Sequence, residues 1–91
     1  MKYLVIIEKG ENNYSAYSLD VLGCAATGKT VEETLETMKE ALEFHCSGMI
    51  GDGEDIPLPK SLNFYLEKTD EISSDNILAH INIKVPELAL A

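Results

Sequence analysis

The first third of the chain alternates between apolar runs and short polar segments, a pattern typical of β-strands joined by tight turns. Residues 2–8 are apolar at almost every position, which predicts a strand covered on both faces in the middle of a sheet. Residues 14–19 predict a second strand, and the Gly- and Asn-containing turn at 9–13 predicts an antiparallel hairpin. The small residues 24–28 predict a third strand against which another element can pack closely. The first strand should carry Tyr3, Val5 and Ile7 on one face and Leu4 and Ile6 on the other.

Residues 30–49 have apolar positions three and four residues apart, which predicts an amphipathic helix. Thr30 is the expected N-cap, and Glu33 completes a capping box with it. Glycines at positions 48, 51 and 53 are expected to end the helix. The buried stripe should contain Val31, Leu35, Met38, Leu42, His45 or Cys46, and Met49. The opposite face should carry Glu32, Glu36, Glu40 and Glu43.

The last third predicts a loop, a short element and a final strand. Residues 60–68 favour a short helix, with a strand as the alternative. Residues 77–85 alternate strictly, which predicts a strand with one buried face that ends at Pro86. That buried face should contain Ile77, Ala79, Ile81, Ile83 and Val85. The whole chain, 1–91, is therefore expected to form one α+β domain of two layers, an antiparallel meander followed by a helix, a possible short second helix and a final strand.

The net charge of the chain indicates which classes of molecule it can bind. Sixteen acidic residues stand against seven basic ones, all of them lysine, and the formal net charge is −9. Nucleic-acid binding depends on Lys and Arg at phosphates, so we expect no direct contact with nucleic acid. An acidic surface suits a basic partner, although it also serves solubility alone. No apolar run reaches ~18 residues and the N-terminus lacks a signal-peptide pattern, so we expect no membrane contact and a cytoplasmic chain with reduced thiols.

The residue types that carry out chemistry are few and poorly spaced. Cys24, His45, Cys46 and His80 form no close ligand pair of the kind that zinc sites use. His45 and Cys46 are neighbours on the predicted helix, so their side chains diverge by about 100° and do not form a nucleophile pair. We therefore expect no catalytic residues, no metal and no cofactor. The cysteines are interpreted as small core residues.

Residues 23–30 match the phosphate-loop string G-x-x-x-x-G-K-T. A functional phosphate loop follows a buried parallel strand in a larger α/β domain and works with a second acidic motif that holds magnesium. Here the string falls on a predicted strand of a small meander, so we interpret the match as coincidence.

Residues 14–35, together with 40–42 and 52–59, resemble the HicB-like family. The similar features, in order, are the aromatic strand with Tyr17, the Asp20-x-x-Gly23-Cys24 turn, the Gly28-x-Thr30 step into the helix, and Glu33 beside Glu32 at its start. The post-helix Gly-Glu-x-Ile-Pro segment is also similar. Leu19 and Leu22 stand where the family commonly has prolines, so this turn is less rigid.

The resemblance implies a partial RNase H-like fold and an antitoxin that binds and blocks a small basic RNA-cleaving toxin of the HicA type. Family members often carry a C-terminal DNA-binding segment, and we expect none in residues 1–91. The residues expected to contact the partner are Tyr17, Asp20, Glu32, Glu36 and Glu40. The residues expected to form the structural motif are Gly23, Cys24, Gly28, Thr30 and Glu33. In this motif we expect Gly23 and Gly28 to supply backbone freedom.

Two other functions stay open at this point. Exposed sheet edges favour self-association, so a homodimer or higher oligomer is expected, and a stand-alone oligomer without a toxin is the main alternative. The second of these two functions is an enzyme that uses the Cys and His residues or the phosphate-loop string. Binding of a nucleotide or a metal would then raise thermal stability.

Overall fold

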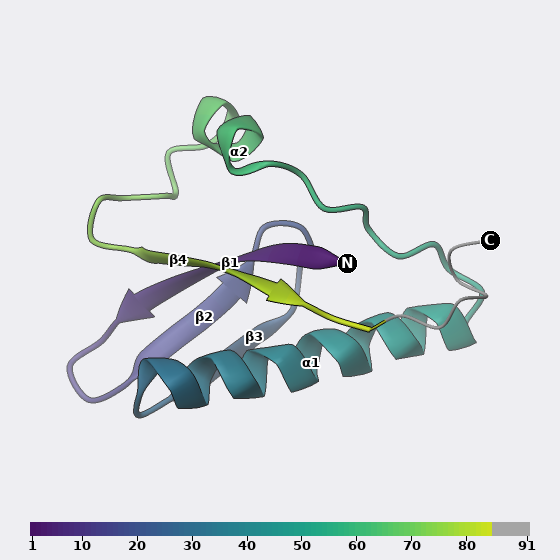
Figure 1. Ribbon diagram of the computed structural model, residues 1–91, viewed down its shortest axis with the longest axis horizontal. Helices are drawn as coiled ribbons and strands as arrows, with labels where there is room; N and C mark the ends of the chain where they lie inside the picture. Colours follow the sequence, from purple (N-terminus) through teal and green to yellow (C-terminus); the bar gives the residue numbers. More distant parts are fainter. Residues whose placement is uncertain (85–91) are drawn as a thin grey trace.

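The computed structural model describes residues 1–84 and contains a four-stranded sheet and two helices (Figure 1). The elements are β1 (Lys2–Lys9), β2 (Tyr14–Ser18), β3 (Ala25–Gly28), α1 (Val31–Gly51), α2 (Leu62–Lys68) and β4 (Ile77–Asn82). The α+β fold class is confirmed, and residues 62–68 form the helix rather than the strand that we kept as an alternative. The expectations for Val85 and Pro86 lie outside the described residues.

The sheet has the order β3-β2-β1-β4, and its three neighbouring pairs are all antiparallel. The predicted hairpin is confirmed, because β1 pairs with β2 from Val5 opposite Ser18 to Lys9 opposite Tyr14. On its other side β1 pairs with β4, from Lys2 opposite Asn82 to Ile7 opposite Ile77. Strand β1 is therefore central, as its continuous apolar run indicates, and β3 and β4 form the two edges.

Both faces of β1 are buried, but by different elements. Tyr3, Val5 and Ile7 have no exposed surface and pack in one cluster with Met38 and Leu42 of α1. The same cluster holds Ile81 and Ile83, so the predicted cover of the sheet by α1 is confirmed. Leu4 and Ile6, on the second face, are also completely buried. Figure 1 shows α2 and the segments beside it on that side of the sheet, opposite α1.

Helix α1 contacts the sheet through a row of residues four positions apart: Thr34, Met38, Leu42 and Cys46. Our expected stripe is confirmed at Met38, Leu42 and Cys46. Val31 and Leu35 are partly buried and pack against the same core, and Met49 is partly buried. The expectation omitted Thr34, which is fully buried. The physical reason lies in Gly28 of β3. A Cβ atom at Gly28 would stand 2.6 to 3.0 Å from three atoms of Thr34, so the missing side chain lets this turn of the helix pack directly on the strand. Of the two candidates at the C-terminal end, Cys46 is the buried one.

The two ends of α1 are capped by the chain itself. The Glu33 N–H donates to the Thr30 hydroxyl (3.0 Å), which confirms the predicted N-cap. At the other end Gly53 has φ +77°, and the Glu54 N–H donates to the Met49 carbonyl at 2.8 Å, as in a Schellman motif. Of the three glycines expected to end the helix, Gly48 lies within α1, so the expectation was wrong there. Gly51 is the last residue of α1, and Gly53 adopts the left-handed backbone just after the C-cap.

The contact at Gly28 leads to a stability prediction. Gly28→Ala should destabilise the protein by about 2 kcal/mol, because the new methyl group meets the backbone of Thr34 and the helix has to move. The matched control is Gly48→Ala, where a Cβ meets nothing within 4 Å. This control should stabilise the helix by about 0.5–1 kcal/mol. Urea unfolding of the two variants measures both values, and an unchanged midpoint for Gly28→Ala would show that the strand and helix separate without cost.

Candidate partner-binding surface

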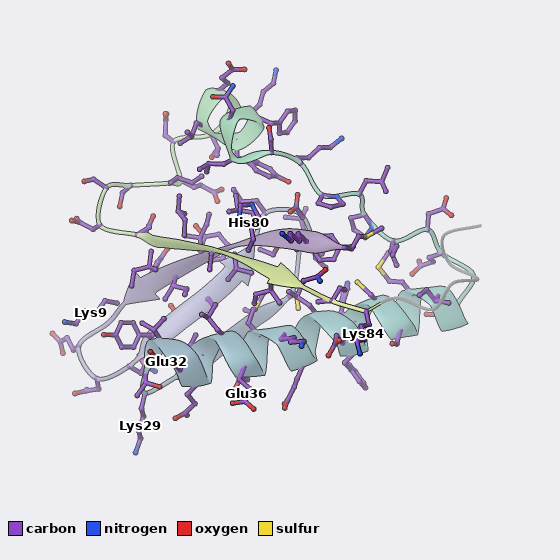
Figure 2. All side chains as sticks on the ribbon, in the orientation of Figure 1. Lys9, Lys29, Glu32, Glu36, His80 and Lys84 are labelled. Carbon is purple, nitrogen blue, oxygen red and sulfur yellow. The ribbon has the colours of Figure 1, made fainter. Side chains whose placement is uncertain are left out.

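The outer side of α1 carries a row of carboxylates. Glu32, Glu36 and Glu40 are exposed and follow one another at intervals of four residues, which places them one above the other on the helix surface. Figure 2 shows Glu36 projecting from α1 away from the sheet. The helix contains five glutamates and one lysine, and its last turn has no basic residue. We call Glu32, Glu36 and Glu40 the acidic face. It is a row of three negative charges along the first three turns.

The same row of the helix continues beyond the carboxylates with an aromatic residue. Phe44 lies four positions after Glu40, and 83% of its surface is exposed, which is unusual for a large apolar side chain. Gly48, one turn further, leaves the surface beside Phe44 open. Phe44 was not among the residues expected to contact a partner, although its position on the polar side of an amphipathic helix was a visible signal.

Tyr17 does not lie near the acidic face. It stands opposite Ile6 on β2, and opposite residues of an antiparallel pair share a face. That is the second face of the sheet, away from α1. Burial raises the pKa of Tyr17, and the nearby negative charges of Glu8 and Glu71 raise it further. The expected partner-binding residues are thus divided between two sides of the molecule.

Asp20 is an internal residue rather than an exposed charge, with 8% of its surface accessible. One carboxylate oxygen accepts from the Leu4 N–H of β1 (2.9 Å). The other accepts from the Lys60 N–H (2.8 Å) and from the Tyr65 hydroxyl of α2. Asp20 therefore ties the β2–β3 connection to the central strand and to the segment that covers the second face. Burial of the Tyr65 side chain raises the pKa of Tyr65, and the hydrogen bond to the Asp20 carboxylate raises it further. The Tyr65 hydroxyl therefore stays a proton donor.

The likeness to known proteins extends over nearly the whole chain. The family model described as the HicB-like antitoxin of bacterial toxin–antitoxin systems matches residues 3–90. The chain belongs to the HicB-like antitoxin family. An uncharacterised 14.9 kDa protein of Haemophilus phage HP1 is 36% identical over 102 residues, which cover 99% of this chain and 77% of the phage protein.

Solved HicB structures have the same fold. The N-terminal domain of the Burkholderia pseudomallei antitoxin HicB superposes with a TM-score of 0.80 at 18% identity, covering 93% of this chain and all of that one. A chain of the HicA3 and HicB3 toxin–antitoxin complex superposes with a TM-score of 0.70 at 24% identity, covering 93% of this chain and all of that one. At these identities the superpositions show the fold alone.

The motif residues of this HicB-like chain have structural roles that can now be described. Gly23 has φ +84°, a conformation that glycine adopts at little cost, so its predicted role in the turn is confirmed. Gly28 has no positive φ, so the expectation of backbone freedom there was wrong, and its role is the close contact with α1. Cys24 is buried in the core cluster beside β3. Residues 23–30, which match the phosphate-loop string, contain β3, and β3 pairs with β2 in the antiparallel sheet.

Both thiols of the HicB-like chain are in apolar surroundings. Burial raises the pKa of Cys24 and, despite a contact with Tyr3, also that of Cys46, whose sulfur lies 3.9 Å from the phenol oxygen. A raised pKa keeps a thiol protonated and so unreactive as a nucleophile. Burial also raises the pKa of Tyr3, whose hydroxyl donates to the Pro57 carbonyl (2.7 Å). These groups hold the core and the loop after α1 together.

One hollow, of about 570 Å³, lies beside the end of β1 and has polar and charged walls formed by Glu8, Lys9, Glu71, Ser73, Asp75 and Asn76. Within residues 1–84, no three His, Cys, Asp or Glu side chains stand together in a way that could hold a metal ion. In the same residues no helix has the length and apolar character needed to cross a membrane. The acidic face is thus the feature with the clearest chemistry.

Proposed function

We propose that this HicB-like chain binds and blocks a small basic RNA-cleaving toxin of the HicA type, with its acidic face as the contact surface. The observation that carries the proposal is the row of three exposed glutamates on α1 in a chain of net charge −9. The fold shared with a chain of a HicA3 and HicB3 toxin–antitoxin complex supports a toxin as the partner. The proposal also places the chain in the cytoplasm, where such a toxin meets RNA.

The physical basis of the blocking is competition for the same positive surface. An RNA-cleaving protein attracts phosphates with Lys and Arg, and a carboxylate row on a rigid helix offers those residues an alternative set of negative charges. Complementary charge speeds the encounter, and the body of the antitoxin then keeps RNA away from the toxin. The low content of basic residues, seven lysines and no arginine, supports an antitoxin domain that does not itself touch nucleic acid.

Asp20 and Tyr17 have different places in this proposal. Asp20 keeps the second face closed through its three hydrogen bonds and so acts on the shape of the domain. Tyr17 is an anchor only for a partner that also reaches the second face, since it lies on the side of the sheet away from α1.

The proposal is tested by affinity capture followed by an RNA-cleavage assay. The tagged chain should recover a small basic protein from cells of its source at low salt and release it at high salt, because exposed charge pairs are screened. The recovered protein should cleave RNA alone and stop doing so when one equivalent of the chain is added. A recovered partner without RNA-cleaving activity, or recovery of the chain alone, would refute the proposed function.

We further propose that the chain forms a homodimer through β4. Within residues 1–84 this edge strand is paired on one side only, by β1, and residues 77–82 carry no charged side chain. Strand edges without charge or proline favour pairing with another strand. Antiparallel pairing of β4 with its copy gives an eight-stranded sheet that leaves the acidic faces free. If the affinity capture recovers only the chain itself, this dimer is the basis of the alternative function, a stand-alone oligomer.

A double substitution tests the dimer. Leu78→Lys with His80→Lys should give a monomer, because like charges would meet across the new strand pair, and both positions are exposed in the single chain. Sedimentation velocity measures the change in mass. Lys2→Glu with Lys9→Glu, on the already paired β1, is the control and should leave the dimer intact. A wild-type monomer, or a variant that stays dimeric, would remove β4 from the interface.

A further inference from the structure

The C-terminal half of α1 contains a second feature that the acidic face does not include. A shallow hollow of about 270 Å³ lies there, lined by Phe44, His45, Gly48, Met49, Asp52 and Glu54. Phe44 forms an exposed aromatic wall, and Gly48 leaves the adjacent surface free of any side chain. Figure 1 shows that these last turns of α1 extend past the strands of the sheet.

The hollow is lined by two carboxylates, Asp52 and Glu54, beside His45. Asp52 is the C-cap of α1 and Glu54 follows two residues later, and both are exposed. The C-terminal end of a helix carries a partial negative charge from its free carbonyl groups, and the last turn of α1 contains no basic residue to offset it. Two carboxylates, a helix C-terminus and an aromatic face together favour a cation whose uncharged part rests on the ring.

We propose that the hollow binds a single arginine or lysine side chain of the basic toxin. The aliphatic stem of that residue packs on Phe44, and its charged head lies between Asp52 and Glu54. The inference rests on the proposed function, because the toxin supplies the cation. It adds that the contact along α1 ends in a specific pocket, which begins one helical turn after Glu40.

The chemistry of the surroundings favours this occupant over a second copy of the chain. Two copies that met through Phe44 would bring their carboxylate rows together, and like charges placed face to face oppose association. A basic partner instead gains from each of these carboxylates. Arginine fits best, since its planar guanidinium stacks on aromatic rings and binds carboxylates in a bidentate manner.

The hollow is tested first with a small probe, so that the result does not depend on the toxin. Chemical-shift titration of the full ¹⁵N-labelled chain with N-acetyl-arginine amide should move the Gly48 amide signal in a saturable way. The citrulline analogue, which has the same shape without the charge, should have no such effect. Phe44→Ala should abolish the response, whereas Phe64→Ala on α2, also exposed, should leave it unchanged. Equal responses to the two amides would overturn the cation site.

The second arm uses the toxin obtained by affinity capture. Phe44→Ala and Gly48→Leu, which fills the hollow, should each weaken toxin binding about tenfold. Both positions are exposed and a Cβ at Gly48 meets nothing within 4 Å, so the fold should remain intact, as circular dichroism can verify. Unchanged affinity in both variants overturns the pocket while the proposed function stands. If Phe44→Ala instead changes the sedimentation of the free chain, the hollow binds a second copy and the inference is wrong.

Discussion

Glu36→Lys together with Glu40→Lys is expected to weaken binding of the basic toxin by about 10- to 100-fold. Both carboxylates are exposed on the outer side of α1, so the substitution replaces attraction by repulsion without touching the core. Neither residue is among those that α1 buries against the sheet, and the unfolding midpoint should stay nearly unchanged. Isothermal titration of the purified variant with the captured toxin measures the change.

A control with the same change in total charge separates a local effect from a general one. Glu11→Lys with Glu67→Lys also raises the formal net charge from −9 to −5, but Glu11 lies in the β1–β2 turn and Glu67 on α2. This pair should change the affinity less than threefold, since exposed charges far from a contact are largely screened at ordinary salt. An equal loss in both double variants would mean that overall charge, rather than the acidic face, attracts the toxin.

Asp20→Ala is expected to destabilise the domain by about 3 kcal/mol, the largest effect of any single change to a polar residue that we predict. The substitution removes the acceptor for three donors: the backbone N–H groups of Leu4 and Lys60 and the hydroxyl of Tyr65. The Leu4 bond is buried, so its donor loses its partner without gaining water. The segment that covers the second face should then come loose. Urea unfolding measures the free energy, and amide exchange of residues 60–68 reports the loosening.

Two further variants test that reading of Asp20. Tyr65→Phe removes only one of the three donors and should cost about 1 kcal/mol. Asp70→Ala, at an exposed position, should change stability by less than about 0.5 kcal/mol. If Asp20→Ala is as stable as the wild type but no longer binds the toxin, Asp20 is a contact residue, as first expected from the sequence, and its structural role is minor.

The elements of the fold follow from local patterns that one sequence displays. The continuous apolar run of β1, the capping residues Thr30 and Glu33, and the alternation of β4 each depend on neighbouring residues, so each was predictable. It was also predictable that Tyr3 and Leu4 lie on opposite faces of the sheet, because the side chains of a strand alternate between its two faces. The resemblance to the HicB-like family rested on such local features, and the family match confirms it.

The composition of the candidate site depends on which residues far apart in the sequence lie close together in space. The pattern of apolar and polar positions along the chain does not contain that information. Asp20 looked like an exposed turn residue, but donors 16, 40 and 45 positions away in sequence surround it. Gly28 looked like a flexible position, yet its role is set by Thr34 on another element. Tyr17 and Glu36 were both expected to contact the partner, and only the three-dimensional arrangement places them on opposite sides of the molecule. Phe44 is different, because its position on the polar side of the helix already indicated the 83% exposure that the structure shows.

The most direct test of the account is to map the toxin contact on the chain itself. Cross-saturation NMR of the deuterated, ¹⁵N-labelled chain bound to unlabelled toxin identifies the amides closest to the partner. If the toxin binds to the acidic face and the hollow, the strongest effects lie along the outer side of α1, from Glu32 through Glu40 to Gly48, and the effects on α2 are weak. Saturation concentrated on α2 or on the second face near Tyr17, with α1 unaffected, would contradict it.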